Sequence, residues 1–234
     1  MHDDLWLTSV EWEAMTLSLR VASLCVLVTL VPGVILGWLL ARRRFPGRTC
    51  LEVAVQLPMV MPPVLVGYML IVLLGREGWL GASLNSWFGV RIAFTTWAAV
   101  IASAVVSLPL VVRSVRLAVE SVDAKLEEAS RVCGASPLDV WLTVTLPAAW
   151  PGVLMGMLLA FVRSLGEFGA TIMFAGNIEG QTRTLPLALF RAMETPGESL
   201  AVTRLAVVAI VLSVCAVLSS EYFNRRCQVA RECG

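Results

Sequence analysis

The chain has 234 residues, of which 58% are hydrophobic and 15% are charged, and its formal net charge is +1. Soluble domains average roughly 45–50% apolar residues and about 25% charged ones. This chain therefore has too few charges to cover a water-facing surface, and its mean hydropathy of +0.80 agrees. The small net charge gives no basic field for a nucleic acid. These values predict an integral membrane protein and argue against a soluble enzyme or a nucleic-acid-binding protein.

Five charge-poor stretches are long enough to cross a bilayer, which takes a helix of about 20 residues. The predicted spans are Val21–Ala41 (beginning nearer Met15), Val53–Leu74, Ile92–Val112, Trp150–Ala175 and Ala201–Ser220. The fourth span is begun at Trp150 because two prolines interrupt the apolar run before and just after it. A further stretch, Thr184–Met193, is too short to cross and is expected to be a re-entrant or interfacial helix. The predicted fold is thus an all-α, polytopic bundle of five membrane helices.

Basic residues are distributed unevenly between the segments that connect these spans. Segments 42–52, 113–149 and 221–234 contain eleven Arg or Lys residues, whereas the opposite segments contain four. The positive-inside rule places the first group in the cytoplasm. We therefore expect a periplasmic segment 1–13, a membrane domain over 14–220 and a cytoplasmic tail over 221–234. The cluster Arg42-Arg43-Arg44 is expected to anchor this topology, with membrane lipid headgroups as a second contact.

The cytoplasmic segment 113–149 is much longer than a link between two spans requires. Apolar residues recur at helical spacing from Leu117 to Cys133, with acidic residues between them. Gly134 can end that helix at positive φ, and Ser136-Pro137 suits the cap and first turn of a second short helix. An amphipathic segment of this length predicts a docking element for a cytoplasmic partner.

A motif in this segment resembles a known one. Glu128-Ala129-Ser130, three residues, Gly134, nine residues and Val144-Thr145-Leu146-Pro147 resemble the "EAA" motif of ABC-importer permeases, with Ser130 for Ala and Val144 for Ile. The resemblance implies the type I ABC importer permease fold, with segment 113–149 as the loop that docks on an ATP-hydrolysing subunit. The residues that it implies for coupling to that subunit are Glu128, Ala129, Ser130, Gly134, Val144, Leu146 and Pro147.

Three other segments narrow the resemblance. Leu57–Tyr68 looks like the second span of molybdate permeases, and Arg163–Thr171 like the fourth span of the sulfate, tungstate and molybdate group. Asn177–Pro186 resembles the outer loop that follows. The resemblance implies import of molybdate, with tungstate as a similar ion and a sulfate, thiosulfate or tungstate permease as the alternative. It also implies a second copy of the chain, two cytoplasmic ATP-binding subunits and a periplasmic molybdate-binding protein as partners.

Two charges fall within the predicted fourth span. A charge near the middle of a bilayer costs about 2.5–3.5 kcal/mol on insertion scales, so Arg163 and Glu167 are expected to face the bundle or water. Their spacing of four predicts that both lie on one helix face. They are either a mutually neutralising structural pair or part of the translocation pathway. Ser164, next to Arg163, is another pathway candidate. So are Pro62 and Pro63, because prolines that break a membrane helix occur where it bends or lines a cavity.

Catalytic, cofactor and metal signals are weak. The phosphate-binding pattern GxxxxGK[ST] needs a lysine, and the only lysine, Lys125, follows Ala124. The only histidine is His2, and no cysteine pair has CxxC spacing. We therefore expect no catalytic residue, cofactor or metal in this chain, with ATP bound and hydrolysed by a partner subunit. A secondary transporter driven by an ion gradient is the alternative of a different class, although it would have no use for the long docking segment.

Overall fold

The computed structural model describes residues 7–232, and every regular element within them is a helix. In chain order these are α1 (Ser9–Arg42), α2 (Arg48–Val60), α3 (Pro63–Leu74), α4 (Gly81–Phe88), α5 (Thr96–Glu120), α6 (Ala124–Val132), α7 (Pro137–Val140), the π-helix η1 (Trp141–Thr145), α8 (Leu146–Leu165), α9 (Gly169–Phe174), α10 (Leu185–Glu194) and α11 (Ser199–Glu232). The first six residues of the expected segment 1–13 and the last two of the expected tail lie outside the described residues.

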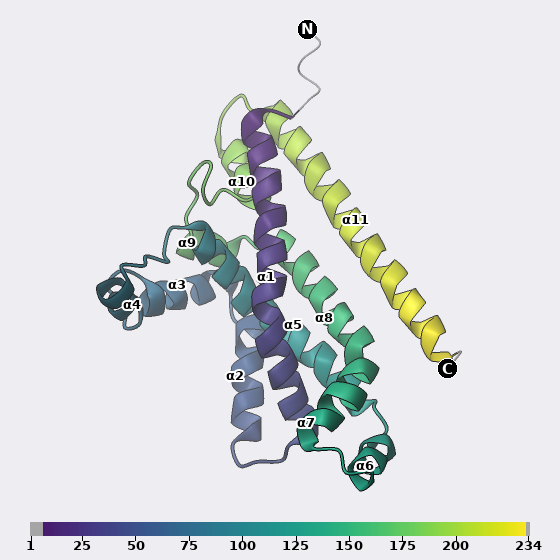
Figure 1. The fold of residues 1–234 in the computed structure, drawn as a ribbon. Coiled ribbons are helices and arrows are strands. Elements are labelled where there is room, and N and C mark those ends of the chain that lie inside the picture. The colour runs from purple at the N-terminus through teal and green to yellow at the C-terminus, as the bar shows by residue number, and fades with distance from the viewer. Residues whose placement is uncertain (1–6, 233–234) are drawn as a thin grey trace.

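Helices α1, α5 and α8 form the centre of the molecule (Figure 1). Their contact is close because small residues face it: a Cβ atom on Gly37 of α1 would lie 2.7 Å from the Cβ of Val115 on α5. Val111 and Val115 of α5 and Val153 of α8 are fully buried in the same cluster. Helix α11 runs beside this centre, and α3 and α4 extend away from it on the other side (Figure 1).

The five-span prediction agrees with the helices that the structure describes. Four of these helices are long and apolar enough to cross a membrane: α1, α5, α11 and the continuous helix Pro137–Leu165 formed by α7, η1 and α8. The pair α2 and α3 counts as the fifth if it is taken as one span. The all-helical membrane architecture is therefore confirmed.

The second span is not the single helix Val53–Leu74 that we predicted. It breaks after Val60, and its halves α2 and α3 are bent by 115°. Met61 still donates its N–H to the carbonyl of Leu57, but Pro62 and Pro63 have no N–H to continue the ladder. Pro63 instead becomes the first residue of α3. The prolines thus produce a complete break.

The fourth span also differs at both ends. Its helix begins at Pro137 and not at Trp150, because η1 widens the backbone just before Pro147 and lets the helix continue into α8. It ends at Leu165 and not at Ala175, and the chain then forms the separate helix α9. Pro147 and Pro151 are thus accommodated within the helix, and the chain breaks at Gly166 instead.

Segment 113–149 contains a longer α5 than expected. This helix continues past Val112 to Glu120, and the predicted amphipathic helix Leu117–Cys133 is divided into the end of α5 and the separate helix α6. The division lies at Ser121–Asp123, where the Ser121 hydroxyl donates to the carbonyl of Ala118 and Asp123 caps α6. The short helix predicted over Thr184–Met193 is confirmed as α10.

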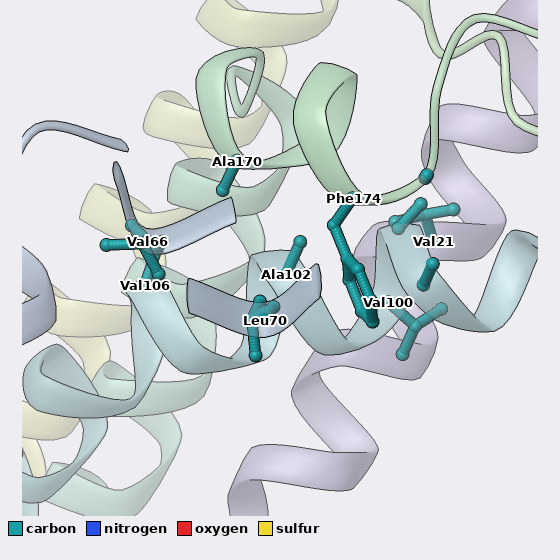
Figure 2. Close-up of a cluster of buried hydrophobic side chains, with 11 residues drawn as sticks. Val21, Val66, Leu70, Val100, Ala102, Val106, Ala170 and Phe174 are labelled. Atoms are coloured by element: carbon teal, nitrogen blue, oxygen red, sulfur yellow. The ribbon is translucent and has the colours of Figure 1, made fainter. Parts of the chain in front are cut away.

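A buried apolar cluster holds the two broken spans against the bundle. Figure 2 shows the side chain of Phe174 of α9 pointing toward α5, with Val100 of α5 and Val21 of α1 on one side of it and Leu70 of α3 on the other. The Phe174 side chain is fully buried. Helices in a membrane are held together by close packing and not by removal of apolar surface from water, so Phe174 stabilises the fold through its contacts with these neighbours. The cluster therefore fixes α3 and α9, the two short helices that follow the breaks.

Candidate functional site

The loop between α5 and α8 is built from two capped helices. The side chain of Asp123 accepts a hydrogen bond of 2.9 Å from the N–H of Lys125 and so begins α6. At the other end, the N–H of Ala135 donates to the carbonyl of Ser130 and that of Gly134 donates to the carbonyl of Arg131. These two bonds form a Schellman motif, which ends α6 as the sequence predicted.

Gly134 sets the angle between the two loop helices. Its φ is +89°, a left-handed conformation that costs other residues free energy, and no atom lies within 4 Å of a Cβ built on it. Ser136 and Asp139 then form a reciprocal capping box that begins α7. The predicted end at Gly134 and start at Ser136-Pro137 are both confirmed.

Four of the seven residues predicted for coupling are exposed. Glu128, Ala129, Gly134 and Pro147 are exposed, and Ser130, Val144 and Leu146 are half-buried. Three large apolar side chains, Leu126, Val132 and Leu138, are exposed beside them. Apolar side chains that gather on one exposed face mark an interaction surface. The loop thus presents a face that is suited to a partner protein.

One residue that holds the loop in place was missed in the sequence. Glu127 is buried, its Oε1 lies 2.9 Å from Nη2 of Arg42 at the end of α1, and the same oxygen accepts the hydroxyl of Thr145 at 2.8 Å. Arg42 also donates to the carbonyl of Val122 at 3.0 Å. These contacts connect α1, α6 and η1. The available signal was the run of arginines after the first span, which required a nearby counter-charge.

The Arg163–Glu167 pair forms, but not on one helix. Nη1 of Arg163 lies 2.7 Å from Oε2 of Glu167, which is two residues past the end of α8. Oε1 of Glu167 accepts the N–H of Ala170 at 2.9 Å, so the carboxylate also caps α9. Its side chain is only 2% exposed, whereas that of Arg163 is 35% exposed. Both carboxylate oxygens are therefore engaged within the protein, and Arg163 is the member of the pair that water or an ion can reach.

The two breaks lie next to each other. A Cβ atom on Gly169 would approach Pro63 Cβ to 2.8 Å, and one on Gly67 would approach the carbonyl oxygen of Ala170 to 2.7 Å. Ser164 is buried at the end of α8, Pro63 is half-buried and Pro62 is exposed. The structure thus brings the predicted pathway residues of the second and fourth spans into one region. Discontinuous membrane helices that meet in this way are typical of transporter binding sites and gates.

The loop that follows α9 is held by its own polar contacts. Arg183 donates to Asn177 and to Glu179, at 2.9 Å and 2.8 Å. The N–H of Leu185 then donates to the hydroxyl of Ser18 on α1 at 2.6 Å. These contacts dock α10 against the end of α1 that lies opposite the α6–α7 loop (Figure 1).

The broken spans, the long apolar helices and the capped loop define a membrane-embedded transport subunit. The profile of the family described as "Binding-protein-dependent transport system inner membrane component" matches residues 33–229. The chain belongs to this family and is a multi-pass inner-membrane protein.

Two relatives and one solved structure specify the likeness. The chain is 49% identical over 219 residues to the molybdenum transport system permease protein ModB of Escherichia coli, covering 94% of this chain and 96% of that one. It is 36% identical over 206 residues to the sulfate transport system permease protein CysW of Synechocystis, covering 86% and 74%. The crystal structure of a bacterial ABC transporter that imports alginate matches with a TM-score of 0.73 at 16% identity, covering 95% and 81%. That last match shows the fold alone.

Proposed function

We propose that this chain is the membrane permease of an ATP-driven importer that moves molybdate, with tungstate as a similar substrate, into the cytoplasm. The observation that carries the proposal is the 49% identity to a molybdenum permease over nearly the full length of both chains. The identity to a sulfate permease is lower, at 36%, and covers less of each chain. The difference favours molybdate over sulfate or thiosulfate.

The partners follow from the exposed loop and from the family. The α6–α7 loop presents Glu128, Leu126 and Val132 at its surface, and this face would dock on an ATP-hydrolysing subunit. The chain has no lysine in a phosphate-binding pattern, so ATP hydrolysis is assigned to that subunit and the permease is not itself an enzyme. The family description supports a substrate-binding protein as a further partner.

A second copy of the chain would complete the path. Helix α3 exposes several large apolar side chains that the described part of this chain does not cover, among them Val64, Leu65, Met69 and Leu73. One bundle of five spans rarely encloses a path that opens alternately to each side. We therefore assign the importer two permease copies, two ATPase subunits and one periplasmic molybdate-binding protein.

The orientation follows from the distribution of basic residues. Eleven Arg or Lys residues fall on the side of the α6–α7 loop and four on the other. The N-terminus is therefore assigned to the periplasm and the C-terminus to the cytoplasm. Reporter fusions after Leu126 and after Glu179 are expected to report cytoplasm and periplasm respectively. Two reporters on the same side would contradict the orientation.

The breaks in the second and fourth spans are the proposed gate region. The guanidinium of Arg163 is partly exposed, so its positive charge can attract a dianion. Glu167 lies at 2.7 Å and offsets this charge, which keeps the anion from binding too tightly to leave. Close packing of Gly67 and Gly169 lets α3 and α9 move together as the path opens.

The function is tested in liposomes that contain the permease and its ATPase subunit. Hydrolysis of ATP and uptake of labelled molybdate should both rise when the molybdate-loaded binding protein is added, and unlabelled tungstate should compete. Sulfate should compete far more weakly. Purified alone, the permease should hydrolyse no ATP. Uptake that follows an imposed ion gradient without ATP would support the secondary-transporter alternative, and stronger competition by sulfate would support the sulfate alternative.

A further inference from the structure

A pocket of about 450 Å³ lies where the end of α1 meets α6, α7 and η1. Two tryptophans, Trp38 and Trp141, form one wall, with their ring centroids 6.4 Å apart in an edge-to-face arrangement. The guanidinium of Arg43 lies 5.7 Å from the centroid of the Trp38 ring. Arg42 and Arg131 complete the charged part of the lining, and Glu127 is its acidic residue.

The charges of this pocket favour an anion. Arg42, Arg43 and Arg131 provide three positive charges, and the single carboxylate of Glu127 offsets one of them. Glu127 lies 2.9 Å from Arg42 and 3.8 Å from Arg131, so it is already shared between two cations. The Nε–H of Arg42 is buried and has no acceptor within the described range 7–232. A phosphate group offers acceptor oxygens to the guanidinium groups of Arg42, Arg43 and Arg131 that line the pocket.

An apolar stripe connects the pocket with the membrane. Ile35 and Val31 of α1 lie one and two turns before Trp38, on the face that continues to Arg42, because residues three or four apart lie on the same side of a helix. Both aliphatic side chains are more than half exposed. Tryptophan and arginine are the residues that anchor proteins at the headgroup level of a bilayer.

We propose that this pocket binds the phosphate headgroup of an anionic phospholipid, whose acyl chain lies along Val31 and Ile35. The lipid would connect Arg43, just after the first span, with Arg131 of α6. It would so hold the loop between α5 and α8, which we call the docking loop, to the membrane surface. A free phosphate ion would use the same arginines but would leave the apolar stripe uncovered. An acidic side chain of a docked subunit would also use the arginines and leave the stripe uncovered. The stripe therefore favours a lipid.

The test measures lipids bound to the complete complex. The full-length permease is purified with its ATPase subunits from membranes that contain phosphatidylglycerol, and native mass spectrometry counts the lipids retained. The variant Arg43→Ala/Arg131→Ala should bind phosphatidylglycerol about 30-fold more weakly, because each basic residue near a surface contributes roughly fivefold to binding of an anionic lipid. The matched control Arg44→Ala/Arg48→Ala removes the same charge from outside the pocket and should retain the lipid.

A second measurement separates a lipid from a free phosphate. In phosphatidylcholine bilayers, phosphatidylglycerol brominated on its acyl chain should quench part of the tryptophan fluorescence, and Trp38→Phe/Trp141→Phe should lose that part. Inorganic phosphate alone should leave the emission unchanged. Equal lipid retention by the two double-arginine variants would overturn the proposal. A complex that retains no phosphatidylglycerol would also overturn it, and this result is expected if an acidic side chain of the ATPase subunit fills the pocket. A saturable change of the emission with phosphate, without quenching by the brominated lipid, would overturn it as well.

Discussion

Two arginine–glutamate pairs of similar geometry have different structural roles. Arg42–Glu127 joins the end of α1 to α6, segments far apart in the sequence, at 2.9 Å. Arg163–Glu167 bridges a single helix break within four residues, at 2.7 Å. In both pairs the carboxylate is nearly buried and the arginine is more exposed. The first pair therefore fixes a tertiary contact, whereas the second fixes the local path of the chain.

The second hydrogen bond of each carboxylate reinforces this difference. Glu127 accepts the hydroxyl of Thr145, which lies on η1 and adds a third element to the contact. Glu167 accepts the N–H of Ala170 and adds only the helix that follows it. A force on the docking loop would therefore reach α1 and α8 through Glu127. The pair at Glu167 would respond when α8 and α9 move relative to each other.

The largest effect is expected from removing the local pair. Glu167→Ala leaves Arg163 without its counter-charge and the N–H of Ala170 without its acceptor. An unpaired charge near the bilayer centre costs about 2.5–3.5 kcal/mol, an upper figure here because Arg163 is 35% exposed. The amount of protein in membranes, measured by immunoblot, should fall several-fold. Glu167→Gln should fall less, because its amide oxygen can still accept from Ala170.

A double variant separates structure from transport at this pair. Arg163→Met/Glu167→Gln removes both charges, keeps an acceptor for Ala170 and should restore the amount of protein. Molybdate uptake per molecule should nevertheless fall by about tenfold or more, if loss of the exposed guanidinium removes at least 1.4 kcal/mol of attraction for the ion. Normal uptake by this variant would show that the pair is structural only. A normal amount of the Glu167→Ala protein in membranes would show that the pair has no structural role.

A smaller effect is expected from removing the long-range pair. Glu127→Ala disconnects α6 from α1 and η1, at a cost of roughly 1–3 kcal/mol for the donors left without acceptors. The helices of the bundle keep their own packing, so the protein should insert normally while copurification of the ATPase subunit and uptake both fall. Glu127→Gln keeps an acceptor for Thr145, so its copurification and uptake should lie between those of Glu127→Ala and those of the unaltered chain. The control Glu120→Ala removes an exposed acid at the end of α5, next to this loop, and Arg116 keeps its other partner, Glu52.

The sequence predicts best where the physical signal is local and repeated. Stretches of apolar residues give the number and the order of the spans, and Gly134 with Ser136-Pro137 gives the turn of the docking loop. Both signals lie within a few residues of the feature that they encode. The resemblance to ABC permeases also rests on such local motifs, and the family match agrees with it.

The features that could not be predicted from the sequence depend on competition between neighbouring signals. Three prolines occur near each of the two spans in question, yet Pro62 and Pro63 break a helix while Pro147 is accommodated by the π-helix before it. Two consecutive prolines remove two donors at the first site, whereas Pro147 removes one. The packing of α3 against α9 and the hydrogen bond from Thr145 of η1 to Glu127 then stabilise each outcome. Glu127 was overlooked for the same reason, since nothing near it in the sequence shows that Arg42 approaches it.

The smallest effect is expected at the turn that orients the docking loop, and two glycines allow a matched comparison. No atom lies within 4 Å of a Cβ built on either Gly134 or Gly166, but φ is +89° at the first and −95° at the second. Replacing each by Ala therefore adds no clash at either site and tests the backbone alone. Gly134→Ala should cost about 1 kcal/mol and Gly134→Val up to about 2 kcal/mol, because the left-handed conformation brings Cβ too close to the following carbonyl.

This cost is small beside the stability of the bundle, so all three variants should reach the membrane in normal amounts. It is large enough to change the angle between α6 and α7, and the ATPase subunit should copurify less with Gly134→Val than with Gly134→Ala. Gly166→Ala has an ordinary φ and should bind the subunit as the unaltered chain does. Equal copurification and uptake by Gly134→Val and Gly166→Ala would mean that the loop only connects α5 to α8. The docking role would then have to lie elsewhere on the same side of the membrane.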